Sequence, residues 1–194
     1  MGVRLRFYVS PEKDREYVKK YFPVFEKVFG KKVFESMLRR RADPRSIERE
    51  AEKVESRWRE VEKRFFGLTG ERFGKWKRKT YLCHVSSTYV CGGGYEYPAV
   101  IVFPFSGQDP LKTIMHELLH LHVIEDAGRL GLVPGDWMVF SEVAVAFMTA
   151  EIGGEFDLPV AFPNDSAERK FRRIRKKVGK GEWSERIREI ADLV

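Results

Sequence analysis

The longest helical pattern of the sequence is followed by a β-rich stretch, and this change constrains the fold more than any other feature. Residues 41–66, RADPRSIEREAEKVESRWREVEKRFF, carry apolar side chains at helical spacing, with Glu and Arg alternating on the opposite face. Residues 79–107, KTYLCHVSSTYVCGGGYEYPAVIVFPFSG, are rich in β-branched and aromatic residues instead. The sequence therefore predicts an α+β fold that is rich in helix and has a small mixed or antiparallel sheet.

The other expected elements follow from apolar periodicity and from Gly, Pro and capping residues. Residues 3–9 alternate apolar and basic side chains, which predicts a half-exposed strand. Ser10 is expected to cap a helix that has Pro11 in its first turn, and Asp43 to cap the long helix, which ends near Gly67 and Gly70. We further expect strands at 80–90 and 99–105, which the glycines at 92–94 separate. Helices are expected at 110–127, ending at Gly128, and at 137–152, ending at Gly153. The tail is expected to contain further helix.

Composition bounds the class of protein. The 194 residues, 43% of them hydrophobic, can form a sizeable core, and the 34% of charged residues resembles the composition of thermophile proteins. The net charge of +7 permits contact with nucleic acid or acidic surfaces but does not require it. We see no secretory signal and no window near the roughly 18 apolar residues that span a bilayer, so we expect a cytoplasmic protein without membrane contact.

Three of the four histidines lie within seven positions, in the segment KTIMHELLHLH at residues 112–122. His116 and His120 are four residues apart, so a helix presents both imidazoles on one side, where they can reach one zinc ion. Glu117 adjoins that side and can take a proton from a metal-activated water without being a ligand. Chance would produce H-E-x-x-H in such a chain only roughly 0.01 times, which favours a zinc site over a helix that is merely packed. His122 points away, and we expect it to be a packed or hydrogen-bonded histidine.

A catalytic zinc ion usually has a third protein ligand. No histidine follows His122, so a third histidine further along the chain is excluded. Glu142 is the only acidic residue between positions 136 and 151, in the apolar segment WMVFSEVAVAFMTAEI, where an unpaired carboxylate is costly. We therefore expect Glu142 to be the third ligand, with Glu151 and Asp126 as weaker candidates. The alternative is that Glu142 lies near an exposed helix start, where the helix dipole favours negative charge.

The motif from His116 to His120, followed 22 residues later by Glu142, resembles the gluzincin class of zinc metallopeptidases, most closely its compact minigluzincin-like members. The resemblance covers residues 80–152. It implies one Zn²⁺ per chain, a peptide or protein substrate, an active-site helix followed by a glutamate helix, and a small sheet whose edge strand, at 99–105, holds an extended peptide. Many gluzincins also have an aspartate four residues after the glutamate ligand to orient a histidine. Ala146 stands there, so a backbone carbonyl or Asp126 is expected to do this.

The expected activity is hydrolysis of a peptide bond by a zinc-activated water, with Glu117 as the general base. Tyr89, Tyr95 and Tyr97 are candidates for stabilising the oxyanion. We expect residues 1–79 to form an N-terminal strand and helices, 80–155 the zinc metallopeptidase core, and 156–194 C-terminal basic helices, packed as one compact unit. The N-terminal helices either pack against the core or gate its cleft, and the oligomeric state is left open.

Two further features leave alternatives open. Residues 168–180, ERKFRRIRKKVGK, have the apolar spacing of an amphipathic helix with a solvated basic face, or they form a patch for nucleic acid or acidic partners. On the second interpretation the chain is a basic nucleic-acid-associated protein whose zinc is structural or absent. Cys83 and Cys91 are expected to be buried free thiols rather than a disulfide, and a second metal site that includes His84 is the weakest alternative.

Overall fold

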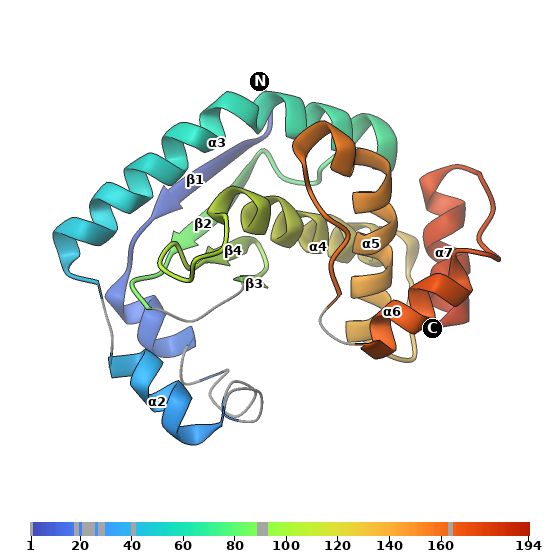
Figure 1. The fold of residues 1–194 in the computed structure, drawn as a ribbon. Helices are drawn as coiled ribbons and strands as arrows, with labels where there is room; N and C mark the ends of the chain where they lie inside the picture. The colour runs from blue at the N-terminus through green and yellow to red at the C-terminus, as the bar shows by residue number, and fades with distance from the viewer. Residues whose placement is uncertain are drawn as a thin grey trace. The chain divides into compact units, whose positions relative to one another are not determined.

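The computed structural model describes residues 2–17, 20, 26, 30–39, 42–88, 93–162 and 165–194 (Figure 1). Helix accounts for 62% of it and the remainder includes a mixed four-stranded sheet, which confirms the expected helix-rich α+β class. The elements are β1 (Arg4–Tyr8), α2 (Lys31–Arg39), α3 (Pro44–Phe73), β2 (Thr80–Val85), β3 (Gly93–Glu96), β4 (Ala99–Val102), α4 (Pro110–Leu130), α5 (Trp137–Phe156), α6 (Asp165–Ile174) and α7 (Trp183–Leu193). Residues 11–17 are also helical.

The sheet has the strand order β1-β2-β4-β3. β1 pairs parallel with β2 and β2 pairs parallel with β4, whereas β3 is antiparallel to β4. The prediction that residues 99–105 form the edge strand is therefore wrong. β4 pairs with β2 on one side and with β3 on the other, so its backbone N–H and C=O groups are already used in the sheet. All four of its residues are also buried.

The strand that takes the edge position, β3, was not expected, because glycines usually interrupt strands. Gly93 and Gly94 serve a different purpose here, since both lie where a side chain does not fit. A Cβ atom on Gly93 would collide with Thr113 and would come within 2.7 Å of Glu117 Oε1, both on α4. A Cβ atom on Gly94 would collide with the Tyr17 hydroxyl. The two glycines thus let β3 run close to the helix residues on either side of it.

Contacts divide the chain into two units. The first, the sheet unit, comprises Arg4–Glu62 and Thr80–Glu117 and contains all four strands. Within it α3 follows the outer edge of β1 (Figure 1), where Glu62 Oε1 accepts hydrogen bonds from Leu5 N at 2.7 Å and from Trp58 Nε1 at 2.9 Å. This carboxylate accepts a hydrogen bond from an N–H group at the edge of the sheet that would otherwise be unpaired. The expected division of the chain at residues 79 and 155 stays a prediction.

The second unit, the helical unit, comprises Met1–Val3, Lys63–Lys79 and Leu118–Val194. Aromatic side chains connect its helices. Ring centroids lie 5.6 Å apart for Phe65 and Phe156 and 5.1 Å apart for Phe147 and Phe171. Contrary to expectation, α5 is long and apolar enough to cross a membrane, but 67% of its most apolar segment is buried inside the protein. α5 thus has the burial of a core helix of a soluble protein.

The expected helix starts are confirmed. Ser10 Oγ accepts a hydrogen bond from Lys13 N at 3.2 Å, and Asp43 Oδ1 accepts one from Ser46 N at 3.0 Å. Asp136 caps α5 in the same way, with Val139 N at 3.1 Å. These bonds satisfy N–H groups that have no partner inside the helix.

The expected helix ends are wrong by a few residues. α3 continues through Gly67 to Phe73, α4 continues through Gly128 to Leu130, and α5 continues through Gly153 to Phe156. A glycine stops a helix where the chain turns into the left-handed region, and those turns occur later. Gly131 has φ 66° after α4, and Asp157 has φ 50° after α5.

Candidate metal centre

The helix α4 is held in place by its apolar residues, and it carries two of the predicted ligands. Leu118, Leu119 and Leu121 are fully buried. His116 is half-buried and His120 is only 2% exposed, one turn further along the same helix. Burial lowers the pKa of His116 to about 4, so that its imidazole is neutral at neutral pH, which is the form that binds a metal ion.

The third predicted ligand approaches from α5. Glu142 Oε1 lies 3.6 Å from His120 Nε2, and its side chain is 17% exposed. One ligand atom each of His116, His120 and Glu142 lie within 4.8 Å of one another. Burial raises the pKa of Glu142 to about 7, because the carboxylate is costly to ionise in this environment. The structure therefore brings together the three residues that the sequence singles out.

A residue that the sequence analysis missed orients His120. His120 Nδ1 lies 2.7 Å from the hydroxyl oxygen of Ser141, which is 1% exposed. A metal bound at Nε2 requires the proton on Nδ1, and Ser141 Oγ is placed to accept a hydrogen bond from that N–H group. The sequence does contain a signal, since Ser141 is a polar residue within the apolar segment and directly precedes Glu142.

The donor set fits zinc. Two imidazole nitrogens and one carboxylate oxygen match the three protein ligands of an open catalytic zinc site, in which a fourth position is left for water or substrate. Within the described ranges the cluster consists of these three residues, with no fourth His, Cys, Asp or Glu. A structural zinc site would have four protein ligands.

Glu117, the predicted general base, directly follows His116 and is 8% exposed. Its side chain lies against β3, because Glu117 Oε1 would be 2.7 Å from a Cβ atom on Gly93. The close approach of a glycine-bearing strand thus shapes the space around this carboxylate.

The two weaker candidates for the third ligand have other partners. Asp126 Oδ2 lies 3.1 Å from His122 Nδ1 and accepts a hydrogen bond from Trp183 Nε1 at 2.7 Å. Glu151 Oε1 forms an ion pair with Arg186 Nη1 at 2.5 Å. Asp126 therefore contacts His122 and does not orient His120. This differs from the expectation that Asp126 replaces the aspartate that many gluzincins have at the position of Ala146.

His122 has the structural role that was predicted. It is fully buried, its Nε2 lies 3.0 Å from the carbonyl oxygen of Gly74, and its ring meets Trp76 edge-on at 4.6 Å. His84 is likewise structural, since its Nε2 lies 2.8 Å from Asp14 Oδ1. Both imidazoles are held by acceptors in the core.

Some predictions fall on parts of the chain that the structure does not describe. Tyr89 and Cys91 lie outside the described residues, so the expected burial of Cys91 stays a prediction. Cys83 is a buried free cysteine, and burial raises the pKa of its thiol. Of the other tyrosines proposed as oxyanion donors, Tyr95 is half-buried on β3 and Tyr97 is 37% exposed in the turn that follows.

Comparison with known proteins does not place the chain in a family. No family model matches the sequence, and neither the curated proteins nor the solved structures include a match. The residues and distances given above are therefore the basis for a functional proposal.

Proposed function

We propose that this protein is a zinc-dependent metallopeptidase, in which His116, His120 and Glu142 bind the zinc ion and Glu117 is the general base. The observation that carries the proposal is the convergence of the three ligand atoms to within 4.8 Å of one another. The hydrogen bond between His120 Nδ1 and Ser141 Oγ supports it, because metal-binding histidines usually have such a partner on their other nitrogen.

Zinc held by these residues would polarise a peptide carbonyl and lower the pKa of a water molecule. Glu117 would take the proton of that water and pass it to the leaving amine when the peptide bond breaks. A carboxylate can do both because taking the proton converts it to a carboxylic acid, and donating that proton to the amine restores the carboxylate. The neutral imidazole of His116 and the partly buried Glu142 would remain ligands throughout.

The substrate peptide is proposed to lie along β3 rather than along β4. β3 pairs with β4 on one side and is the last strand of the described sheet, so an extended peptide can add to it through backbone hydrogen bonds. Gly93 brings this strand next to Glu117. A peptide added at β3 would thus have its backbone close to the general base.

The experiment that tests the proposal compares wild type with Glu117→Gln. Zinc content and cleavage of an unfolded protein substrate are measured on the same samples. We expect the variant to keep its zinc and to lose activity by roughly 10²–10⁴-fold, which is the usual contribution of a general base. Equal cleavage by both proteins would show that Glu117 does not act as the base.

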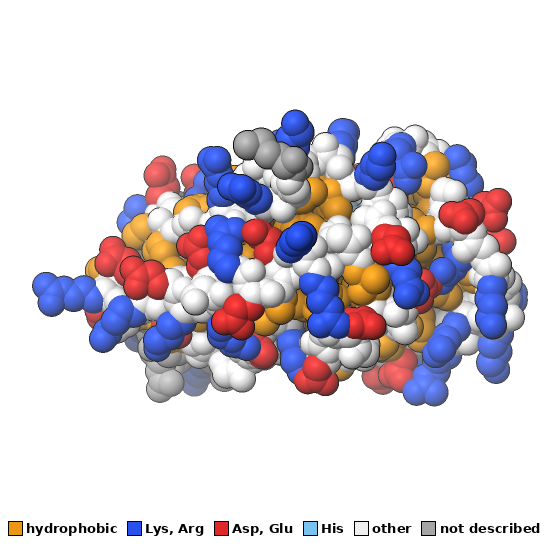
Figure 2. Space-filling model, turned by 90° about the horizontal axis from the view of Figure 1, so that it is seen from above, with side chains coloured by type: hydrophobic (Ala, Val, Ile, Leu, Met, Phe, Trp, Pro, Cys, Tyr) orange, Lys and Arg blue, Asp and Glu red, His pale blue; other side chains and the backbone are white. Residues whose placement is uncertain are grey.

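The alternative function is binding to nucleic acid, with zinc structural or absent. The net charge of +7 favours it, but on the face drawn in Figure 2 the Lys and Arg side chains are interspersed with Asp and Glu rather than gathered in one patch. In α6, Phe171 and Ile174 are buried, as in an amphipathic helix that packs against the protein. Salt-dependent binding to DNA or RNA without peptide cleavage would favour this alternative.

A further inference from the structure

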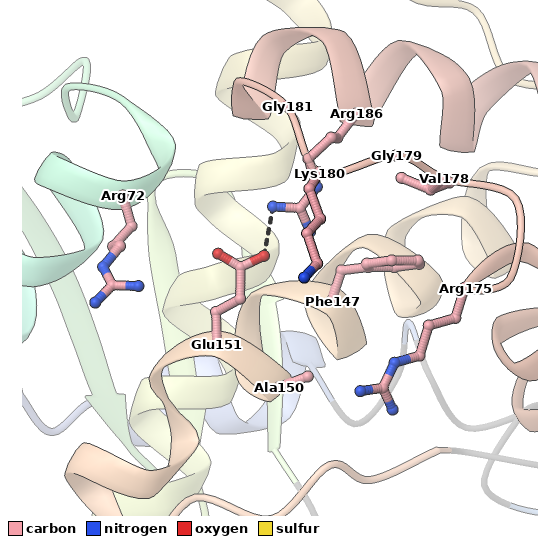
Figure 3. Close-up of a pocket in the computed structure, with 10 residues that line it drawn as sticks. All are labelled: Arg72, Phe147, Ala150, Glu151, Arg175, Val178, Gly179, Lys180, Gly181 and Arg186. Atoms are coloured by element: carbon pink, nitrogen blue, oxygen red, sulfur yellow. Dashed lines mark ion pairs between the residues drawn. The ribbon is translucent and has the colours of Figure 1, made fainter.

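A second site lies within the helical unit, in a pocket of about 470 Å³ (Figure 3). Its side chains come from four segments that are distant in sequence: the end of α3, the second half of α5, the stretch after α6, and α7. The pocket has the size of a small-molecule site. It is also basic, because it is lined by Arg72, Arg175, Lys180 and Arg186.

The charges in the pocket do not balance. Glu151 is the one acidic residue of its lining, and its ion pair with Arg186 Nη1, at 2.5 Å, is drawn as a dashed line in Figure 3. In the described part of the chain, no carboxylate forms an ion pair with Arg72, Arg175 or Lys180. The lining residues therefore carry four positive groups and one negative group, and the Glu189 carboxylate, which accepts a hydrogen bond from the lining residue Gly179 at 3.2 Å, offsets part of this surplus from beside the pocket.

One of these cations is half-buried, and one of its donor atoms has no acceptor in the described structure. The Arg186 side chain is 14% exposed, and its guanidinium lies 5.7 Å from the ring centroid of Phe147 and 5.7 Å from that of Trp183. Its Nε atom is buried and has no hydrogen-bond acceptor among the described residues. Since a buried donor without an acceptor is costly, this arrangement favours a ligand that accepts hydrogen bonds.

We propose that this pocket binds a small anion that carries a phosphate group. A phosphate dianion offsets most of the surplus charge, which a single carboxylate does not, and guanidinium groups bind phosphate oxygens through paired hydrogen bonds. The lining also includes the apolar side chains of Phe147, Ala150 and Val178, which would contact an organic part of the ligand. The class of ligand is thus a phosphate monoester of a small organic molecule.

This site is distinct from the proposed metal centre and does not depend on it. Glu151 is nine residues after Glu142 on α5, which is about 13 Å along the helix axis. The two sites share this helix, but none of the proposed metal ligands lines the pocket.

The test is a calorimetric titration of the full chain with phenyl phosphate, and with inorganic phosphate as the ligand without an organic part. The variant Arg175→Gln/Lys180→Gln removes two exposed cations of the pocket. The matched control is Lys176→Gln/Lys177→Gln, which removes the same charge from the same exposed segment outside the lining. We expect one phenyl phosphate per chain, bound about tenfold or more weakly by the pocket variant and within about twofold of wild type by the control. Inorganic phosphate should bind at the same site but more weakly.

Phosphate also binds zinc, so the titration is repeated on His116→Ala, which removes a proposed metal ligand but leaves the pocket intact. Unchanged binding there would locate the ligand in the pocket, whatever the fate of the peptidase proposal. The proposal is overturned if phenyl phosphate does not saturate a site, if His116→Ala abolishes binding, or if both charge variants weaken it equally. A short single-stranded RNA is titrated as well. The proposal is also overturned if this RNA binds more tightly than phenyl phosphate and loses as much affinity in the control variant as in the pocket variant. That result would mean that the basic segment is a diffuse nucleic-acid surface.

Discussion

His120 Nδ1 lies 2.7 Å from Ser141 Oγ, and Ser141 is the residue immediately before the proposed ligand Glu142. Two consecutive residues of α5 therefore act on one histidine of α4. One approaches the imidazole nitrogen that would bind zinc, and the other holds the opposite nitrogen. This arrangement fixes the ring orientation, and with a metal ion at Nε2 the proton would lie on Nδ1, where Ser141 Oγ can accept a hydrogen bond.

We expect Ser141→Ala to weaken zinc binding by about 10–100-fold, because His120 loses the hydrogen-bond acceptor of its Nδ1–H group. Zinc affinity is measured by competition with a chelator of known affinity. Thr149→Val is the matched control, since Thr149 is also a buried hydroxyl residue of α5 and its Oγ1 has no hydrogen-bond partner in the described structure. Equal zinc affinity of Ser141→Ala and wild type would show that Ser141 has no part in the site.

Gly93→Ala should reduce peptide cleavage more than zinc binding. The added methyl group would collide with Thr113 and press on the Glu117 carboxylate, so β3 or Glu117 must shift. Thr113→Ser removes the methyl group that causes the closest collision, and we expect the double variant to recover part of the lost activity. The measurements are kcat, KM and zinc content of the single and double variants. Full activity of Gly93→Ala would contradict the close packing of β3 against the general base.

The metal ligands could be predicted from the sequence because each carries a local signal. His116 and His120 are spaced for one side of a helix, and Glu142 is an isolated carboxylate in an apolar segment. Ser141 was missed as a functional residue because a serine near a helix start usually serves local hydrogen bonds. Only the fold shows that its hydroxyl faces a histidine 21 positions earlier in the chain.

The sheet was predicted only in part, for a physical reason. Gly93 and Gly94 have little tendency to form a strand, and their position is set by the space between the helix residues Glu117 and Tyr17. The resemblance to gluzincins had implied that residues 99–105 form the edge strand, whereas tertiary pairing places β4 inside the sheet. The basic pocket could not be predicted from the sequence for a similar reason. Its cations are spread from position 72 to position 186 and come together only in the folded chain.

Asp126→Asn is expected to lower the free energy of unfolding by roughly 2–4 kcal/mol without loss of zinc, because Asp126 is part of a buried network and not a ligand. Burial opposes its ionisation, but bonds from His122, Arg129 and Trp183 outweigh this effect and lower its pKa. Urea denaturation and elemental analysis of the same variant test both parts. Loss of zinc from a folded Asp126→Asn protein would indicate that Asp126 is a zinc ligand.

Asp14 should make stability dependent on pH in the acid range. It is 1% exposed, and although burial alone would raise its pKa, hydrogen bonds from His84 and Ser87 lower the pKa from 3.8 to about 2. A lowered folded pKa stabilises the protein above pH 3.8, and this stabilisation is lost as the pH falls through about 2.

We therefore expect Asp14→Asn to cost about 2 kcal/mol at pH 7, and the difference from wild type to shrink as the pH falls from 4 to 2. Urea unfolding at a series of pH values measures it. Asp192→Asn, at an exposed position of α7, is the control and should follow wild type at every pH. A cost of Asp14→Asn that does not change with pH would mean that the Asp14 carboxylate does not ionise with a lowered pKa.

The central claim is that His116, His120 and Glu142 bind one zinc ion, and elemental analysis of the purified protein tests it most directly. Wild type is measured beside Glu142→Ala and beside Glu151→Ala, which removes the other glutamate of α5 that was considered as a ligand. The account predicts one zinc per chain in wild type and in Glu151→Ala, and little or none in Glu142→Ala. Wild type that takes up no zinc even after incubation with it, or Glu142→Ala that retains a full equivalent, would contradict the account.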